Sequence, residues 1–278
     1  MGLNLSVLTV QNNAIISNKT ANFNNIEKLL APYQGKQIDI INFAEVWATG
    51  WCCKNFQNDA ESVENSPIID FLKSVSEEFD ALVFGGSFIR KTKNNEYKNS
   101  CPIVNRGKLA AIYDKMHLYS HKGSEEDKFI TNGDNLLIVD TGNTKIGTSI
   151  CYDIRYPEIY REYSKNGVEI LIHASAWSKT KPDHWEIMHR ARAMENQCFM
   201  IVADQCGKID KNNCNLGHSL VADAWGNIEN ELGEEEACMH TIINIDKLRD
   251  LRKNFPLLND RRDQNFKTFK IKEIKLYE

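Results

Sequence analysis

The feature that most constrains the fold of this chain is a repeated alternation between short apolar segments and segments with helical spacing. The stretch LNLSVLTV (residues 3–10) has the pattern of a strand, and the next segment places Ile26, Leu29 and Leu30 on one helical face. The alternation continues with an expected strand, helix and strand at residues 38–45, 66–79 and 81–90. Buried strands between helices need cover on both faces, so the sequence predicts a layered α/β fold.

The second half of the chain resumes this alternation after a polar interruption at residues 91–100. Hairpins are expected at 101–115 and 136–150, and strands at 218–232 and 237–245 are expected to pair around the Trp225–Asn227 turn. The other expected elements, two helix–strand pairs and a final helix, lie at residues 157–167, 168–177, 182–197, 198–207 and 246–256. We expect residues 1–278 to form a single domain, with a C-terminal tail after about residue 256.

Composition restricts the class of protein. Hydrophobic residues make up 42% of the chain and charged residues 26%, which is typical of a folded protein. A net charge of -4 offers no broad basic surface, so nucleic acid is not an expected partner. The sequence has no nucleotide-binding glycine motif, no C-x-x-C pair and no apolar run of about 18 residues. We therefore expect no cofactor, no metal and no membrane partner.

The eight cysteines are scattered irregularly along the chain. They are too few for a disulfide scaffold in a protein of this length, so reduced thiols and a cytoplasmic location are expected.

Three reactive or charged residues follow predicted strands. Glu45 comes directly after one buried strand, Lys115 after a second and Cys151 after a third. A single charge or cysteine at a strand end is commonplace, but the carboxyl ends of parallel strands are where α/β proteins bind ligands. The three together indicate a functional site, and we expect a helix N-terminus and a nearby cation to lower the pKa of Cys151.

The segments around these residues, NFAEVWATGW, YDKMHLY and GTSICYDIRYPE, resemble the three signature blocks of the nitrilase superfamily, the carbon-nitrogen hydrolases. The similarity extends from the first strand to GHSLVADAWGNI and so covers nearly the whole chain. The resemblance implies a four-layer α-β-β-α sandwich, two sheets face to face with helices outside. It also implies a homodimer.

By this resemblance Glu45, Lys115 and Cys151 form a catalytic triad. Cys151 would attack the carbonyl carbon of a small amide and form a thioester, which water then hydrolyses. Lys115 and the backbone N–H of Tyr152 would hold the oxyanion, and Glu45 would carry the protons. A supporting glutamate is implied in the following loop, where Glu126 matches best and Glu125 stays open.

The segments FAEVWATGW, YDKMHLY and HASAW are most similar to the omega-amidase-like branch, whose substrates are monoamides of small dicarboxylic acids such as 2-oxoglutaramate. The substrate pocket is then expected to be lined by Trp47, Tyr152 and Trp177. Arg155 or a nearby lysine would pair with the free carboxylate of the substrate.

Other interpretations use the same residues differently. Within the family, the substrate could instead be a deaminated glutathione, an N-carbamoyl compound or a nitrile. A Cys-His hydrolase would pair Cys151 with His117, His173 or His218, but it leaves Glu45 and Lys115 without a role. A catalytically silent binding protein is the alternative outside enzymes, and it does not explain why charged residues should be buried at three strand ends.

Overall fold

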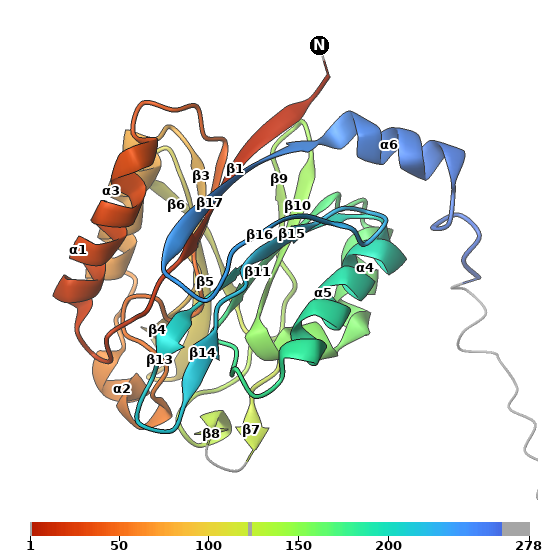
Figure 1. The fold of residues 1–278 in the computed structure, drawn as a ribbon. Coiled ribbons are helices and arrows are strands. Elements are labelled where there is room, and N and C mark those ends of the chain that lie inside the picture. Colours follow the sequence, from red (N-terminus) through yellow and green to blue (C-terminus); the bar gives the residue numbers. More distant parts are fainter. Residues whose placement is uncertain (1, 122–123, 263–278) are drawn as a thin grey trace, which may run out of the picture.

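The structure is a computed structural model that describes residues 2–121 and 124–262. Two β-sheets pack face to face, with helices on the outer side of each (Figure 1). The predicted four-layer α-β-β-α order is therefore what the structure has. The tail expected after about residue 256 lies mostly outside the described residues.

The first sheet carries the N-terminal half of the chain and receives one strand from the C-terminal part. Among the described residues it has seven strands in the order β17-β1-β2-β3-β5-β4, with β6 paired to β5. Their bounds are β1 Asn4–Gln11, β2 Ile40–Asn42, β3 Leu82–Phe84, β4 Phe88–Lys91, β5 Tyr97–Asn105, β6 Lys108–Asp114 and β17 Ala237–Asn244. Strands β1, β2 and β3 run parallel, and β17 lies antiparallel to β1.

The second sheet is built from strands between residues 138 and 231. Among the described residues it has six strands in the order β16-β15-β12-β11-β10-β9. Their bounds are β9 Ile138–Asp140, β10 Lys145–Ile150, β11 Ile170–Ser175, β12 Phe199–Asp204, β15 Leu220–Ala222 and β16 Ile228–Glu231. Because β10, β11 and β12 are parallel, their carboxyl ends meet at one edge.

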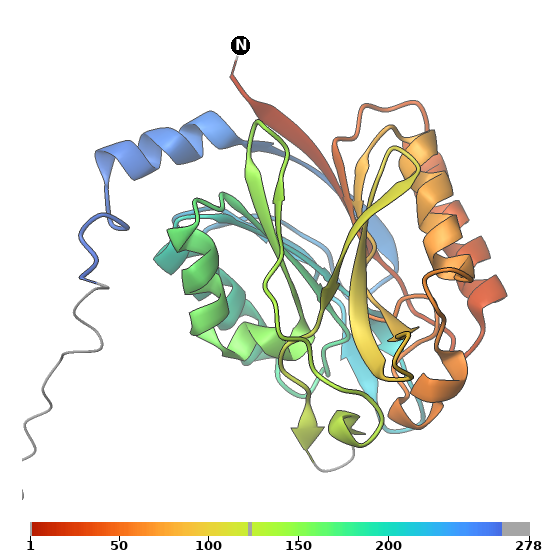
Figure 2. The same ribbon diagram turned by 180° about the vertical axis from the view of Figure 1, so that it is seen from behind.

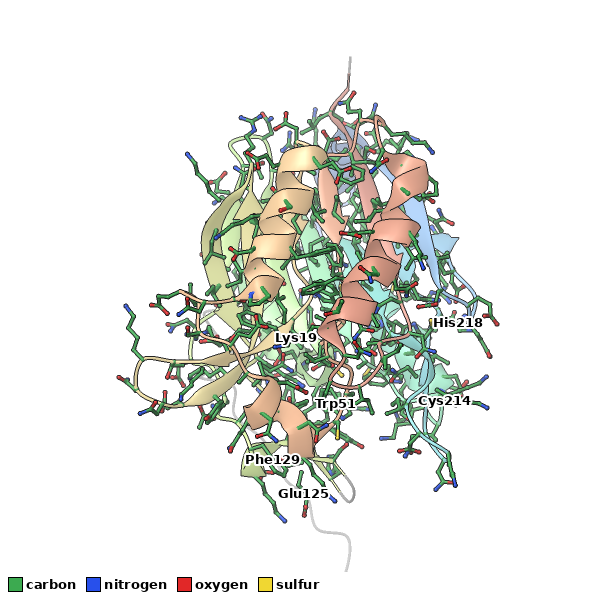
Figure 3. The ribbon with its side chains drawn as sticks, turned by 90° about the vertical axis from the view of Figure 1, so that its left-hand side faces the viewer. Lys19, Trp51, Glu125, Phe129, Cys214 and His218 are labelled. Atoms are coloured by element: carbon green, nitrogen blue, oxygen red, sulfur yellow. The ribbon has the colours of Figure 1, made fainter. Side chains whose placement is uncertain are left out.

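The outer layers are formed by two pairs of helices. α1 (Lys19–Leu30) and α3 (Pro67–Glu78) cover the first sheet, as Figure 3 shows face-on. α4 (Pro157–Lys165) and α5 (Pro182–Asn196) cover the second sheet (Figure 2). Ser66 caps the N-terminus of α3, since its hydroxyl accepts a hydrogen bond from the Ile69 N–H at 3.1 Å.

Smaller elements connect these layers. Two short hairpins, β7–β8 and β13–β14, lie at the lower end of the molecule in Figure 1. Their bounds are β7 Ser120–His121, β8 Ser124–Glu125, β13 Cys206–Lys208 and β14 Cys214–Leu216. The remaining helices are η1 Ala31–Tyr33, η2 Cys53–Asn55, α2 Phe56–Asp59, η3 Glu126–Lys128, η4 Cys151–Arg155 and α6 Ile245–Asn254.

The side-chain alternation of β1 explains why the sheets stack. Val7 belongs to the hydrophobic cluster between the sheets, whereas Leu8 belongs to the cluster beneath α1 and α3. Successive residues of a strand point to opposite faces, so one strand supplies both cores. Within the described residues, no helix is long and apolar enough to cross a membrane.

One predicted pairing is wrong. The strands expected at 218–232 and 237–245 do not form one pair. The Trp225–Asn227 turn joins β15 to β16 within the second sheet, and β17 instead crosses to β1 in the first sheet. The alternation of residues in a strand fixes which faces are buried, but it does not say which partner strand is used.

Candidate active site

Cys151 stands at the turn from β10 into η4. Its φ of 43° is in the left-handed region, which a non-glycine residue adopts only where neighbouring contacts hold it. Asp153 supplies those contacts, because its Oδ2 accepts a hydrogen bond from the Ile150 N–H at 3.0 Å and from the Tyr113 hydroxyl at 2.7 Å. Its Oδ1 accepts the His117 N–H at 2.9 Å. The sharp turn at Cys151 is thus fixed from both sheets.

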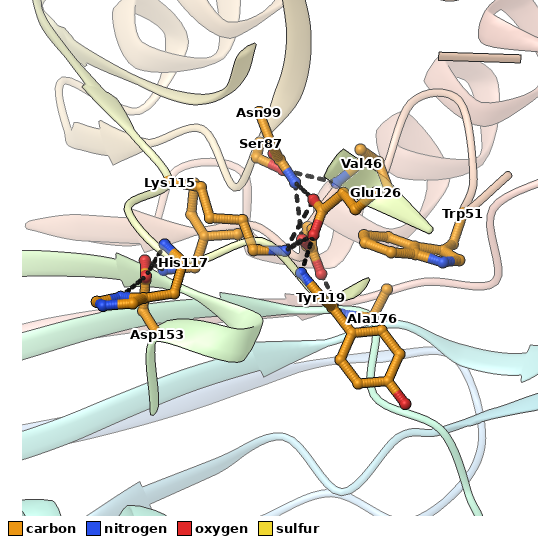
Figure 4. Close-up of polar contacts among 12 residues, drawn as sticks. Val46, Trp51, Ser87, Asn99, Lys115, His117, Tyr119, Glu126, Asp153 and Ala176 are labelled. Carbon is orange, nitrogen blue, oxygen red and sulfur yellow. Dashed lines mark hydrogen bonds and ion pairs between the residues drawn. The ribbon is translucent and has the colours of Figure 1, made fainter. Parts of the chain in front are cut away.

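Lys115 lies just beyond β6, between two carboxylates (Figure 4). Its Nζ is 2.9 Å from Oε1 of Glu45 and 2.9 Å from both carboxylate oxygens of Glu126. The ammonium also lies 5.1 Å from the centre of the Trp51 ring. Burial disfavours the charge of Lys115, but Glu126 and Glu45 outweigh burial and raise the pKa of this group above its ordinary value. Lys115 is therefore a permanent cation.

Glu45 follows β2 and is fully buried. Its Oε1 also accepts a hydrogen bond from Asn99 Nδ2 at 2.8 Å, and its Oε2 accepts the Ala176 N–H at 3.1 Å. The side chain of Gln205 donates to the Glu45 carbonyl at 2.6 Å. Groups from both sheets thus fix the carboxylate that the sequence predicts to be the base.

The open choice between Glu125 and Glu126 has a structural answer. Glu126 is buried, and besides Lys115 it accepts the Tyr119 N–H at 2.6 Å. Burial and the nearby charge of Glu45 raise the pKa of Glu126, against the lowering by Lys115. Glu125 is exposed and pairs with Lys128 at 2.7 Å. The structure therefore brings Glu126 to Lys115 and leaves Glu125 at the surface.

The pKa of Cys151 differs from the expectation. Burial raises the pKa of this thiol well above its ordinary value, and the negative charge of Glu45 raises it further. Lys115 and the Ser175 hydroxyl lower it, but they do not outweigh burial and Glu45. The predicted lowering of the pKa is therefore corrected: burial and the charge of Glu45 favour the neutral thiol.

A cavity of about 560 Å³ opens onto Cys151. Its wall includes Tyr152, Arg155 and Trp177, together with Trp51 and Lys181. The Arg155 guanidinium lies 5.0 Å from the centre of the Trp177 ring and 5.8 Å from that of Tyr152. The cavity is large enough for a small amide and has both aromatic and cationic walls.

Trp47 does not line this cavity, and its predicted role is corrected. The ring is fully buried in the cluster beneath α1 and α3, and its centre lies 5.0 Å from that of Phe43. Its indole N–H donates to the Gly85 carbonyl at 2.9 Å. Trp47 follows Glu45 by two residues, but the chain turns at Val46, where φ is 44°, and directs the indole into the core.

The sequence did not reveal several groups that hold the two glutamates. Asn99 lies in the polar interruption at residues 91–100, but it belongs to β5 and reaches Glu45. The N–H groups of Ala176 and Tyr119 also contact carboxylates. Backbone N–H groups do not depend on the type of residue, so the sequence gives no indication of these contacts.

The histidines are engaged elsewhere. His117 stacks on Tyr156 with ring centres 3.6 Å apart, His173 bonds Ser149 at 2.8 Å, and His218 bonds Glu231 at 2.9 Å. Each has a structural partner, so the geometry gives a Cys-His pair no support. Among residues 2–121 and 124–262, no group of three His, Cys, Asp or Glu residues could hold a metal ion.

Known proteins are similar to this chain in sequence and in fold. A model of the carbon-nitrogen hydrolase family matches residues 7–253. A 2-oxoglutaramate amidase of Paenarthrobacter nicotinovorans is 33% identical over 81% of this chain and 78% of its own length. The omega-amidase NIT2 of Xenopus tropicalis is 28% identical over 88% of this chain and 90% of its own length.

The crystal structure of Saccharomyces cerevisiae Nit3, a member of branch 10 of the nitrilase superfamily, superposes with a TM-score of 0.85. It is 25% identical, and the match covers 93% of this chain and 97% of Nit3. The resemblance that rested on three sequence blocks is confirmed. The chain belongs to the carbon-nitrogen hydrolase family and is an amidase.

Proposed function

We propose that Cys151, Glu45 and Lys115 are the catalytic triad of this amidase. The observation that carries the proposal is the buried Lys115 ammonium, which lies 2.9 Å from both Glu45 and Glu126 beside the cavity that Cys151 lines. Burying one cation between two carboxylates is costly to stability, and such clusters persist where they serve a reaction.

The reaction begins when Glu45 takes the thiol proton and Cys151 Sγ attacks the amide carbon. The carbonyl oxygen becomes an oxyanion, which the Lys115 ammonium and the Tyr152 N–H stabilise. The C–N bond then breaks as Glu45 returns the proton to the leaving nitrogen, which departs as ammonia and leaves a thioester. Water attacks the thioester, Glu45 takes its proton, and the acid departs as the thiol is restored. Glu126 holds Lys115 throughout.

The substrate we propose is the monoamide of a small dicarboxylic acid, such as 2-oxoglutaramate. Lys181 and Arg155 both line the cavity, and neither pairs with a carboxylate within the described residues. Lys181 Nζ contacts the Tyr119 hydroxyl at 3.1 Å, which leaves donors for a further acceptor. The cavity also contains Asp210, but Asn213 Nδ2 already donates to this carboxylate at 2.8 Å. The names of the relatives quoted above point to the same substrate class.

Ammonia release tests this proposal. The enzyme is incubated with 2-oxoglutaramate, a peptide-like amide, an N-carbamoyl amino acid and a nitrile. We expect the highest kcat/KM for the dicarboxylic monoamide and no turnover by Cys151→Ala. Cys238→Ala, which removes a largely buried thiol on β17, is the matched control and keeps full activity. Turnover of the nitrile or the carbamoyl compound alone would contradict the substrate class, and an active Cys151→Ala enzyme would exclude the triad.

We also propose that the protein is a homodimer. An exposed apolar patch supports this, formed by Met194 of α5, Trp225 of the β15–β16 turn and Phe255 after α6. The rings of Trp225 and Phe255 lie 5.4 Å apart, and the exposed fraction of Trp225 is 53%. Large exposed aromatic side chains mark contact surfaces between proteins. Sedimentation velocity should give twice the chain mass, and Trp225→Glu should give the monomer; a monomeric wild-type enzyme would refute the dimer.

A cytoplasmic location is the last part of the proposal. All eight cysteines are free thiols, as expected in a reducing compartment. Cell fractionation tests it, and recovery of the protein outside the cytoplasmic fraction would contradict it.

A further inference from the structure

Tyr119 contributes more to the site than the backbone N–H that Glu126 accepts at 2.6 Å. Its carbonyl also accepts the Glu126 N–H at 3.2 Å, so the two residues are bonded in both directions. The Glu126 carboxylate in turn holds the Lys115 ammonium at 2.9 Å. Figure 4 shows the Tyr119 ring extending from this anchor, away from Lys115, and the residue lines the cavity. The backbone of Tyr119 is therefore tied to the group that is proposed to hold the oxyanion.

The hydroxyl of Tyr119 meets the side chain of Lys181. Lys181 Nζ donates to Tyr119 Oη at 3.1 Å and lies 5.2 Å from the centre of the ring. Lys181 comes directly before α5, and its carbonyl accepts the Trp177 indole N–H at 3.0 Å. A lysine has a long flexible stem, so contacts at both of its ends reduce the freedom that binding of an anion would otherwise remove. Lys181 thus presents its charge to the cavity in one orientation.

Both groups keep donors for a ligand. A hydroxyl that accepts a hydrogen bond retains its own proton, and within residues 2–121 and 124–262 the Tyr119 O–H has no acceptor. The Lys181 ammonium has three donors and uses one of them on Tyr119. A carboxylate offers two oxygens, and its hydrogen bonds with such donors are stronger than those between neutral groups. The phenol and the ammonium together therefore match one carboxylate.

The charges along the cavity wall favour an anion as well. Among the described residues, the lining includes the cations Lys54, Arg155 and Lys181 and a single carboxylate, Asp210. Asp210 already accepts three hydrogen bonds within its own loop, one of them from Asn213 Nδ2 at 2.8 Å. Its negative charge is thus engaged by neighbouring donors. Positive charge is in excess where Tyr119 and Lys181 meet the cavity.

We propose that Tyr119 is a specificity-determining residue, whose O–H donates to one oxygen of the far carboxylate of the substrate while Lys181 donates to the other. Because Tyr119 is bonded to Glu126 and Glu126 to Lys115, this carboxylate site lies at a fixed distance from the position of the oxyanion. The pair therefore selects the length of the chain between the amide and the acid. The inference rests on the proposed function, in which the substrate is a dicarboxylic monoamide.

The first test is the change Tyr119→Phe, which keeps the ring and both backbone bonds to Glu126. KM for 2-oxoglutaramate should rise about tenfold with kcat within about twofold, since one hydrogen bond to a charged group is lost. KM for butanamide, which has no carboxylate, should not change. Tyr33→Phe is the matched control, because it removes a hydroxyl that donates to the Cys238 carbonyl at 2.8 Å, and both constants should match the wild type.

The second test is a series of monoamides, succinamate, glutaramate and adipamate, in which each member is one methylene longer than the one before. The wild type should favour one length by about tenfold or more in kcat/KM. In Tyr119→Phe the spread between the three should narrow, because Lys181 loses its partner and its flexible stem can follow a carboxylate at other distances.

Three results would overturn the inference: an unchanged KM of Tyr119→Phe for 2-oxoglutaramate, an equal rise in KM for butanamide, or the same spread of chain lengths in variant and wild type. Turnover of butanamide by Tyr119→Phe at the wild-type rate shows that the variant is folded. A wild-type enzyme that prefers butanamide to the carboxylate-bearing amides would instead refute the proposed substrate class.

Discussion

The ammonium of Lys115 lies 2.9 Å from Oε1 of Glu45, and neither side chain reaches solvent. The proposed base and the proposed oxyanion partner are thus bonded to each other before substrate arrives. Lys115 binds one oxygen of the Glu45 carboxylate and the Ala176 N–H binds the other, so the two contacts together fix the orientation of the carboxylate. Each group positions the other, so a change at one is expected to disturb both.

Glu45→Gln should reduce kcat by on the order of 10³-fold. The amide keeps one oxygen, which can accept from Lys115, but its NH2 group cannot accept from the Ala176 N–H and the side chain cannot take up the thiol proton. Steady-state ammonia release measures the effect, and thermal unfolding should show a folded protein. Glu186→Gln, a surface change on α5 that loses an ion pair with Arg190, is the control with unchanged kcat. Activity of Glu45→Gln within tenfold of the wild type would remove Glu45 from the mechanism.

Glu126→Gln should lower kcat by about 10²-fold, because Lys115 then loses one of its two anionic partners and shifts from its position. Glu125→Gln is the matched control in the neighbouring residue, and kcat should stay within about twofold because Glu125 is exposed. Parallel kinetics on the two variants check this directly. Equal losses in both would show that burial beside Lys115 is not the relevant difference.

Lys181→Met should raise KM for 2-oxoglutaramate about tenfold with little change in kcat, because a charge-assisted hydrogen bond to the substrate carboxylate is lost. An amide without a carboxylate should show no such change. Lys179→Met removes a neighbouring lysine that pairs with Glu234 on the surface, and its KM should match the wild type. If Lys181→Met affects both substrates equally, Lys181 does not contact the carboxylate.

The protein should lose stability as the pH falls below about 6.5. Burial lowers the pKa of His173 well below its ordinary value and lowers that of His189 to about 3. The unfolded chain therefore binds protons on these two residues between about pH 6.5 and 3, while the folded chain does not, so stability rises with pH in this range. At about pH 5 the two histidines together should cost roughly 2 to 4 kcal/mol.

Urea unfolding at about pH 7 and pH 5 measures this loss. Asp204 and Glu126 have raised pKa values and act in the opposite direction, so wild type alone does not isolate the histidines. His189→Gln removes one of the two groups and should show a smaller loss between the two pH values. An equal loss in His189→Gln would assign the acid sensitivity to other groups.

The sequence predicted the strand ends of the site well but could not predict which side chains turn toward it. Glu45, Lys115 and Cys151 lie where buried strands end, and the apolar pattern identifies such ends. Trp47 has the same local setting, but the fully buried ring packs on aromatic residues of α1 and α3 that are remote in sequence. Whether an aromatic lines a pocket or fills a core depends on those remote partners.

Contacts between residues that are remote in sequence also determine which residues belong to the site where the sequence pattern left this open. Glu125 and Glu126 are adjacent in sequence, and their partners distinguish them: Glu126 binds Lys115, whereas Glu125 pairs with Lys128 at the surface. Asn99 was hidden in a polar stretch in which residues 93–96 are exposed. Local propensity and hydrophobic periodicity depend on neighbouring residues, so they do not predict contacts between residues that are remote in sequence.

The pairing of β17 with β1 has a consequence for how the protein is made. Asn4 lies opposite Asn244, so the first strand synthesised pairs with one that follows some 230 residues later. Until then that edge of β1 has open backbone groups and can associate with other chains. The first sheet therefore cannot be completed before residues 237–244 have been synthesised, and a long exposure of the β1 edge to aggregation follows from the topology.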